Sequence, residues 1–330
     1  MKHLQRLLLL ALLALPLLAR AAEQKPYRVM MLLYRGSTDA ERGFMDYLKA
    51  RLPVEFIVRD AAEDKEKIPG FIAEAKKLKP DLIYTFGTSM TLATVGKADN
   101  ANPAGTISNI PVVFNIVADP VGSKLSHTLA SSGRNLTGVS HLVPMADQLK
   151  AAERLGKIGR LGVVYNPQEP NSLLAVKDLQ DNAARFGYTL LPAAIALDDA
   201  GKATPEAIAA AVQQLLIGKI DYLYLPSDSS LIQQADAIVA PATAAGVPVI
   251  SATEAPIRKN GALMGLVGNY YNAGAFAGYK AEQILLKRKT AAAIPMETLQ
   301  RFSLVVNMQT ARALKRYPPL EEFRIAELLR

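Results

Sequence analysis

The 330-residue sequence has no cysteine, no tryptophan and only three histidines, which are His3, His127 and His141. Without cysteine the chain can form no disulfide, no thiolate metal site, no cysteine nucleophile and no lipid-anchored bacterial N-terminus. Because His3 lies in a segment that we expect to be cleaved, the composition also argues against a multi-histidine metal centre.

Signatures of the common enzyme classes are missing as well. The chain has no G-x-S-x-G elbow, no G-x-x-x-x-G-K-[ST] loop, no G-x-G-x-x-G after the first predicted strand and no H-E-x-x-H. Neither His127 nor His141 stands in an obvious Ser/Asp arrangement. We therefore expect no catalytic residue, no metal and no organic cofactor. A hydrolase with paired carboxylates stays open as an alternative, because the loops of any α/β protein supply Asp and Glu.

The composition is that of a folded chain with dispersed charge. Hydrophobic residues make up 50% of it and charged residues 21%, which excludes a disordered chain and allows a sizeable core. The formal net charge is +8, but the basic residues form no stripe with interleaved aromatics, so we expect no nucleic-acid partner. At about 150 residues per domain, the length favours two domains.

Residues 1–22 have the pattern of a secretory signal peptide. Lys2 and Arg6 form a short positive region, and residues 7–18 form an apolar run too short to cross a bilayer core of ~30 Å comfortably. Ala19-Arg20-Ala21 is an A-x-A-like cleavage site. A membrane anchor is the alternative. We expect the mature chain to start near Ala22 and to be exported to the periplasm.

Short apolar runs rich in β-branched residues alternate with helical patterns along the rest of the chain. An example of a helix is the i, i+3, i+4 set Phe44, Tyr47 and Leu48, which follows a capping box at residues 38–41. Continuous apolar strands separated by helices predict parallel sheets covered on both faces. The predicted strands are Val29–Leu33, Val54–Val58, Leu82–Phe86, Val112–Ile116, Leu161–Tyr165, Tyr188–Ala194, Tyr222–Leu225, Val247–Ile250 and Leu263–Val267.

The second half of the sequence echoes the first in order and at a nearly constant offset. Residues 28–34 match 160–165, residues 81–89 match 221–229, and Pro111-Val112-Val113 with Asp119 matches Pro248-Val249-Ile250 with Glu254. The echo predicts two doubly wound, Rossmann-like α/β lobes joined by a multi-crossover hinge. We expect one lobe from residues 27–140 plus 268–298 and the other from 145–264 plus 302–330. Ligands of open α/β sheets sit outside the carboxyl ends of the strands, so the two lobes predict one cleft between them.

Several segments together resemble the ABC-transporter substrate-binding proteins, in particular the TrpX-like members with a type I periplasmic-binding-protein fold. They are Pro111–Phe114 with Asp119-Pro120-Val121, GRNLTGVS at 133–140, IGRLGVVYNPQEPNS at 158–172, PSDS at 226–229, GVPV at 246–249, and 261–278 with its Tyr270-Tyr271 pair. The resemblance implies a monomer that captures a small solute, with amino acids, including aromatic ones, among the family's ligands. It also implies delivery to an ABC permease and ATPase complex at the inner membrane. A solute-sensing receptor for a membrane signalling protein is the alternative.

Two positions depart from the family pattern. Where members often read Asp-Asn-Thr, this chain has Asp228-Ser229-Ser230, and where an Asp often precedes the tyrosine pair it has Asn269. Both positions are expected to face the cleft, so the departures leave the ligand open.

The loops after the predicted strands supply the candidate ligand-binding residues. In the first lobe, Gly87, Thr88 and Ser89 open a helix whose free N–H groups and hydroxyls can hold a carboxylate, unless the hydroxyls only cap the helix. Asp119 and Glu254 follow equivalent strands, where a carboxylate suits an ammonium group, the alternative being a role in the hinge. Acidic side chains beside helix starts favour a zwitterion. Arg35 is either a second carboxylate partner or a surface residue.

The remaining candidates have equally plain structural alternatives. Glu169 could receive an amine and Asp228 could bond ligand polar groups, whereas Asn171, Ser172 and Asp228 could instead cap helices. Aromatic rings in the cleft could stack on a planar ligand or merely pack helix on sheet. The full candidate set adds Tyr34, Phe86, Asn166, Ser227, Ser229, Asn269 and Tyr270 to the residues named above.

Overall fold

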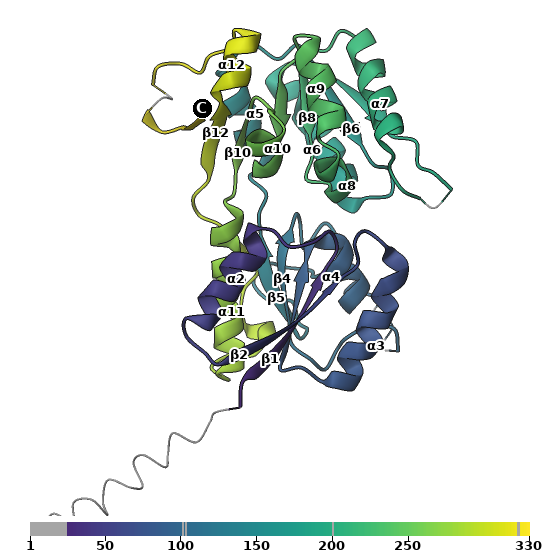
Figure 1. Ribbon diagram of the computed structural model, residues 1–330, viewed down its shortest axis with the longest axis vertical. Helices are drawn as coiled ribbons and strands as arrows, with labels where there is room; N and C mark the ends of the chain where they lie inside the picture. The colour runs from purple at the N-terminus through teal and green to yellow at the C-terminus, as the bar shows by residue number, and fades with distance from the viewer. Residues whose placement is uncertain (1–24, 101, 103, 200, 322–323) are drawn as a thin grey trace, which may run out of the picture.

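The computed structural model describes residues 25–100, 102, 104–199, 201–321 and 324–330, so the predicted signal peptide lies outside the described residues. Two α/β lobes lie one above the other in Figure 1. Each is built on its own sheet. Within the described residues, none of the helices combines the length and apolar character that crossing a bilayer requires.

The first sheet has the strand order β11-β5-β4-β3-β1-β2, and all of its neighbouring strands run parallel. Helices cover both faces, because alternate residues of β1 point to opposite sides. Val29 and Met31 pack with α2 and α11, whereas Met30 and Leu32 pack with α3 and α4. The bounds are β1 Tyr27–Leu33, α2 Asp39–Lys49, β2 Val54–Asp60, a 3-10 turn at Lys65–Lys67, α3 Ile68–Leu78, β3 Leu82–Phe86, α4 Gly87–Val95, β4 Val112–Val117, β5 Leu136–Ser140, α11 Tyr270–Leu285, a 3-10 turn at Ala291–Ala293, and β11 Glu297–Thr298.

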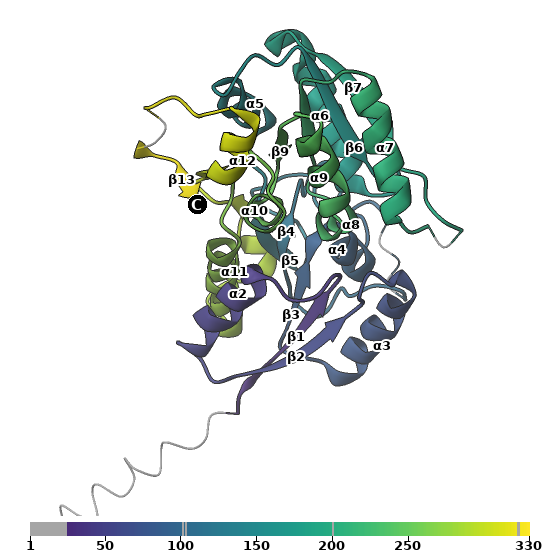
Figure 2. The same cartoon turned by 45° about the horizontal axis from the view of Figure 1, so that its top comes forward.

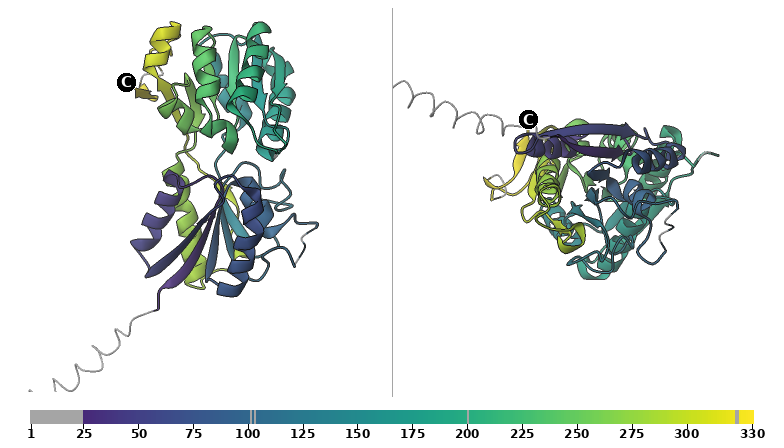
Figure 3. Two further views of the ribbon diagram at one scale, coloured as in Figure 1. Left: turned by 45° about the vertical axis from the view of Figure 1, so that its right-hand side comes forward. Right: turned by 90° about the horizontal axis from the view of Figure 1, so that it is seen from below.

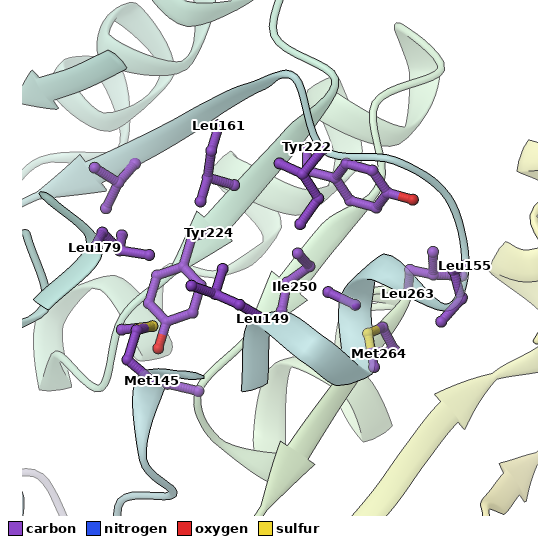
Figure 4. Packing of buried hydrophobic residues seen from close by; sticks show 14 of the residues in the cluster. Met145, Leu149, Leu155, Leu161, Leu179, Tyr222, Tyr224, Ile250, Leu263 and Met264 are labelled. Carbon is purple, nitrogen blue, oxygen red and sulfur yellow. The ribbon is translucent and has the colours of Figure 1, made fainter. Parts of the chain in front are cut away.

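The second sheet has the order β13-β12-β10-β9-β8-β6-β7, and only the β10–β12 pair is antiparallel among its described strands. One face packs on α5, α6 and α12, through the cluster that contains Tyr222 and Tyr224 (Figure 4), and the other face packs on α7, α9 and α10. The bounds are α5 Met145–Glu153, β6 Arg160–Tyr165, α6 Pro170–Phe186, β7 Thr189–Ala194, α7 Pro205–Ile217, β8 Tyr222–Leu225, α8 Ser229–Gln233, α9 Asp236–Ala244, β9 Val249–Ser251, α10 Glu254–Lys259, β10 Met264–Val267, β12 Ser303–Asn307, α12 Met308–Leu314 and β13 Glu327–Leu329.

The two sheets repeat one design. The order β5-β4-β3-β1-β2 in the first sheet matches β10-β9-β8-β6-β7 in the second. The same side-chain bond recurs at equivalent places. Asp81 accepts the backbone N–H of Arg28 at 2.7 Å, and Asp221 accepts that of Arg160 at 2.7 Å. The predicted doubly wound α/β class and its internal repeat are therefore confirmed.

The chain passes between the two sheets three times, after β5, after β10 and after β11 (Figure 3). The return through α11 is fixed to the first sheet by close helix packing. A Cβ at Gly274 of α11 would overlap the carbonyl oxygen of Ala40 in α2, so the two backbones can touch only because glycine stands there. Lys280, only 1% exposed, then donates to Glu297 at 2.6 Å and holds β11 beside α11.

The sequence pattern did not predict four of the described strands, namely β5, β11, β12 and β13. β5 has the sequence LTGVS, in which Thr, Gly and Ser interrupt the apolar run that would predict a buried strand. The strand is nevertheless almost wholly buried. Its Gly138 is required, because a Cβ there would overlap the backbone of Phe114 in the neighbouring strand. The predicted capping box is confirmed, since Thr38 and Glu41 cap the start of α2 reciprocally.

Candidate functional site

Loops at the carboxyl ends of both sheets converge on one small central cavity. Residues at the start of α4 from the first lobe and of α8 from the second both line it, and Figure 2 shows these two helices at the boundary between the lobes. The cavity has a volume of about 10 Å³, roughly the room that one water needs. It is lined by Tyr34, Arg35, Phe86, Gly87, Thr88, Ser89, Met90, Ile116, Glu169, Asn171, Ser227, Ser229, Ile232 and Tyr270.

Three hydrogen bonds join the two sides of the cavity. The Ser89 hydroxyl, in the first turn of α4, donates to Glu169 Oε1 at 2.8 Å. His141, in the first crossover, shares a 2.9 Å bond with the Ser227 hydroxyl. Gln233 donates to the backbone carbonyl of Arg35 at 3.3 Å. The cleft is thus nearly closed by the protein's own polar groups.

Two buried carboxyl groups stand on the second-lobe side. Burial and the nearby Asp228 carboxylate raise the pKa of Glu169 from 4.5 to about 7. Burial also raises the pKa of Asp228, whose Oδ2 accepts from the Ser172 hydroxyl at 2.8 Å and whose Oδ1 accepts from the Leu231 N–H at 3.0 Å. Asp228 therefore does cap α8, as one interpretation of the sequence held. A cation placed between these groups would relieve the cost of their charge.

The start of α4 faces the Glu169 carboxyl. Phe86 is the residue that precedes this helix, and in the described structure no side chain caps it. The interpretation of Thr88 or Ser89 as the cap is therefore wrong, because Gly87, with φ +79, already opens the helix and both hydroxyls belong to its first turn. N–H groups at a helix start that no side chain caps can bind an anion.

Arg35 lies in the cavity rather than on the surface. Its guanidinium sits over the Phe86 ring, 5.3 Å from the centroid, and its Nε is buried with no hydrogen-bond partner among the described residues. Its charge lowers the pKa of Asp228 and of the half-buried Glu63, although burial outweighs this effect at both carboxyls. Among the residues that line the cavity, Arg35 thus brings a positive charge opposite the acidic Glu169.

Aromatic rings form the inner wall. The Tyr270 ring meets Phe86 edge-on with centroids 6.5 Å apart, and His141 meets Tyr270 at 5.7 Å. The rings therefore both pack together and line the cavity, so the two interpretations of the sequence are not exclusive. Burial lowers the pKa of His141 to about 3, so this imidazole is neutral and is a poor proton acceptor at neutral pH.

Three residues that line the cavity were never candidates, namely Met90, Ile116 and Ile232, and neither was His141, which bonds the cavity residue Ser227. His141 could have been suspected from its place in the first crossover. Ile116 carries φ +57, an unusual conformation for a β-branched residue, and the strand register shifts between Asn115 and Val117. The Asn115 side chain accepts the Ile116 N–H at 3.0 Å and supports this bulge. The sequence carries no signal for it.

Six of the candidates do not line the central cavity, and one of them is the fully buried Asp228 described above. Asn166 accepts the Gln168 N–H at 2.9 Å, and Ser172 accepts the Asn166 N–H at 3.2 Å, so both shape their loop. Because α6 begins at Pro170 with Glu169 before it, neither Asn171 nor Ser172 is its cap, contrary to one interpretation of the sequence.

The other three are more distant. Asn269 caps α11 by accepting the Asn272 N–H at 2.9 Å. Asp119 accepts the N–H groups of Val121 and Gly122 and lines an adjacent pocket. Glu254 pairs with Arg258 at 3.1 Å and lines an outer pocket of about 700 Å³. Across the described part of the chain, no group of three or more His, Asp and Glu side chains is placed to hold a metal ion.

Two similar α/β lobes, three crossovers and a polar cavity between the lobes define a two-lobed solute-binding protein. The family model for ABC transporter substrate binding proteins matches residues 38–317, and the chain belongs to that family. The predicted family resemblance is confirmed. Members of the family bind solutes and are not enzymes.

Individual relatives agree with this assignment. The chain is 28% identical over 301 residues to a "Tyrosine-binding protein" of Clostridioides difficile (strain R20291), covering 88% of this chain and 81% of that protein. A conserved domain protein of Vibrio cholerae superposes with a TM-score of 0.80 at 24% identity, covering 93% and 100% of the two chains. The structure of an ABC domain from Streptococcus pneumonia in complex with L-Trp superposes with a TM-score of 0.78 at 21% sequence identity. The match covers 92% of this chain and 100% of that one. These two structures establish the fold.

Proposed function

We propose that this protein captures an amino acid, or a closely related small zwitterion with an aromatic side chain, in the cleft between its lobes and delivers it unchanged to an ABC importer. One observation carries the proposal. The buried Glu169 carboxyl, with the Asp228 carboxyl near it, faces the uncapped start of α4 and the Arg35 guanidinium across the cavity. Opposite charges held at the two sides of a small space match the two charges of an amino acid.

Different groups of the cavity would bind the two charged ends of the ligand. The ligand's ammonium group would lie near Glu169 and Asn171, where burial makes an unpaired carboxylate costly. Its carboxylate would lie against the first turn of α4 and Arg35, which supply N–H donors and a positive charge. Tyr34, Phe86, Tyr270 and the hydroxyls of Ser89, Ser227 and Ser229 complete the wall. The names of the tyrosine-binding relative and of the L-Trp complex support an aromatic ligand.

Entry of the ligand requires the lobes to separate. The cavity volume of about 10 Å³ holds a water but no amino acid. We assign residues 27–140 plus 268–298 to one lobe and 145–264 plus 302–330 to the other, so the three crossovers form the hinge. A ligand would then replace the Ser89–Glu169 bond as the link across the cleft.

Export and delivery complete the proposal. The signal pattern at residues 1–22 supports transport to the periplasm, where the closed protein would dock on a permease and ATPase complex. One chain supplies both walls of the cavity, so a monomer suffices for binding.

Thermal-shift screening of the purified protein against free amino acids, aromatic acids, sugars and nucleosides tests the ligand class. A ligand at one hundred times its Kd should stabilise the protein by ~2.7 kcal/mol. Glu169→Gln should abolish the shift, whereas Glu206→Gln, an exposed change on α7, should retain it. A clear shift with a sugar or nucleoside and none with any amino acid would contradict the proposal.

A further inference from the structure

A second pocket, of about 220 Å³, adjoins the central cavity. Asn171 and Ser227 line both spaces, so the two are neighbours across these side chains. The volume is far above the ~10–15 Å³ that one water needs and below the ~300 Å³ typical of drug-sized ligand pockets. It has the size for one end of a small solute.

The body of this pocket is apolar. Leu142, Val143 and Met145 come from the first crossover and the start of α5, and Leu174 comes from α6. The Tyr224 ring closes the pocket, and Figure 4 shows its hydroxyl directed toward Met145. That hydroxyl donates to Gln148 Oε1 at 2.9 Å, so the ring can offer its apolar surface to a guest. An aromatic or aliphatic group suits such walls.

Two carboxylates stand in the same pocket, one from each lobe. Asp119 follows β4 of the first sheet, and Asp178 lies on α6 at the solvent-exposed rim. Burial, and after it the charge of Asp119, raise the pKa of Asp178, as expected for two acids that face a shared space. None of the described residues that line the pocket is basic.

A third acceptor joins the pocket to the central cavity. The Asn171 side chain is only 8% exposed, and its Oδ1 has no hydrogen-bond partner among the described residues. A buried acceptor without a donor is costly, and native structures seldom leave one unmatched. Asn171, Asp119 and Asp178 all offer oxygen acceptors, so the missing partner must bring hydrogen-bond donors.

We propose that this pocket is the side-chain subsite of the cleft, and that Asp119 and Asp178 select solutes whose apolar aromatic body ends in an O–H or N–H donor. The inference rests on the proposed function, because the amino-acid backbone of the ligand must occupy the central cavity for its side chain to reach this pocket. A phenol or an aromatic N–H would reach the rim and donate to a carboxylate. A plain phenyl ring would fill the same walls and leave the carboxylates unmatched.

Calorimetric titration of the purified protein with L-tyrosine and L-phenylalanine tests the inference. Wild type should bind tyrosine about tenfold more tightly than phenylalanine. Asp178→Ala should weaken tyrosine binding and leave phenylalanine binding unchanged, bringing the ratio near one. Asp119→Asn, which keeps an oxygen for the Val121 and Gly122 N–H groups, should lower the ratio in the same direction. The matched control is Asp181→Ala, which is on α6 and pairs with Lys177, and it should retain the wild-type ratio.

Equal binding of the two amino acids by wild type, or a ratio that neither variant changes, overturns the subsite and leaves amino-acid capture standing. Failure of every amino acid to bind overturns both proposals.

Discussion

Ser89 and Glu169 belong to different lobes and are joined by a 2.8 Å hydrogen bond from the serine hydroxyl to the buried carboxyl. Each residue stands at the start of a helix, Ser89 in the first turn of α4 and Glu169 immediately before α6. The bond spans the space in which we place the ligand. We call this bond, which links the two lobes across the cleft, the latch.

Removing the latch should open the protein. Ser89→Ala deletes a hydrogen bond whose net contribution is about 0.5–1.5 kcal/mol, so the ratio of open to closed molecules should rise roughly two- to tenfold. Small-angle X-ray scattering of the ligand-free protein should then show a larger radius of gyration. Ser229→Ala alters another hydroxyl of the same cavity and should leave it unchanged. Equal effects of the two variants would argue against the latch.

Stability should fall as the pH rises from about 4.5 to about 7. Glu169 has a folded-state pKa of about 7 against an ordinary value of 4.5, so the folded protein binds its proton more tightly than the unfolded chain does. The resulting stabilisation is complete below pH 4.5 and is lost as the pH passes 7. Thermal melting at several pH values should show this decline, and Glu169→Gln should flatten it and raise the melting temperature above that of wild type at pH 8. Glu206→Gln should follow the wild-type profile.

Arg35 should recognise the ligand's carboxylate. Arg35→Ala should lower the affinity for a free amino acid about tenfold or more, because a charge-assisted hydrogen bond contributes about 1.5–3 kcal/mol. The amide of the same amino acid lacks the carboxylate, so its affinity should change much less. Calorimetry of both ligands with both proteins forms a double cycle that isolates this one pair. An equal loss for acid and amide would show that Arg35 acts only by packing on Phe86.

The glycine contact between α2 and α11 should tolerate no side chain. Gly274→Ala places a Cβ against the backbone carbonyl of Ala40 and should destabilise the protein by about 1–3 kcal/mol. Gly70→Ala is the matched control. Gly70 is an exposed residue of α3 with no atom near its future Cβ, and alanine should stabilise that helix by up to ~1 kcal/mol. Chemical denaturation of both variants measures the difference, and an undisturbed Gly274→Ala would contradict the close contact.

Local patterns predicted most of the fold, because apolar strands and capping residues act through neighbouring positions. Leu82–Phe86 and Tyr222–Leu225 are strands with the predicted bounds, and Thr38 caps α2 as expected. β12 was missed because it pairs with β10, from which it is separated in sequence by α11 and β11 of the other lobe, so no local pattern marks the pairing.

The site was less predictable from the sequence, because the hydrogen-bond partners of its side chains come from loops that are distant in sequence and adjacent only in the folded protein. Ser172 was expected to cap a helix or touch ligand, yet it donates to Asp228 from another loop. Arg35 has no sequence feature that separates a surface arginine from one lying over Phe86. Asp119 and Glu254 do occupy equivalent places after their strands, as the internal echo suggested, but the lobes meet so that each lines a different pocket.

The position of α11 late in the sequence, at Tyr270–Leu285, has a consequence for the order in which the protein folds. A ribosome finishes β1 to β5 early, yet the helix that shields Val29, Met31 and Val113 from water is translated only after strands β6 to β10. The lobe whose first strands are synthesised earliest is thus the last to complete its apolar core. A nascent chain shorter than about 298 residues lacks part of this lobe, because β11 ends at Thr298. The first lobe can therefore complete its core only when synthesis of the chain is almost over.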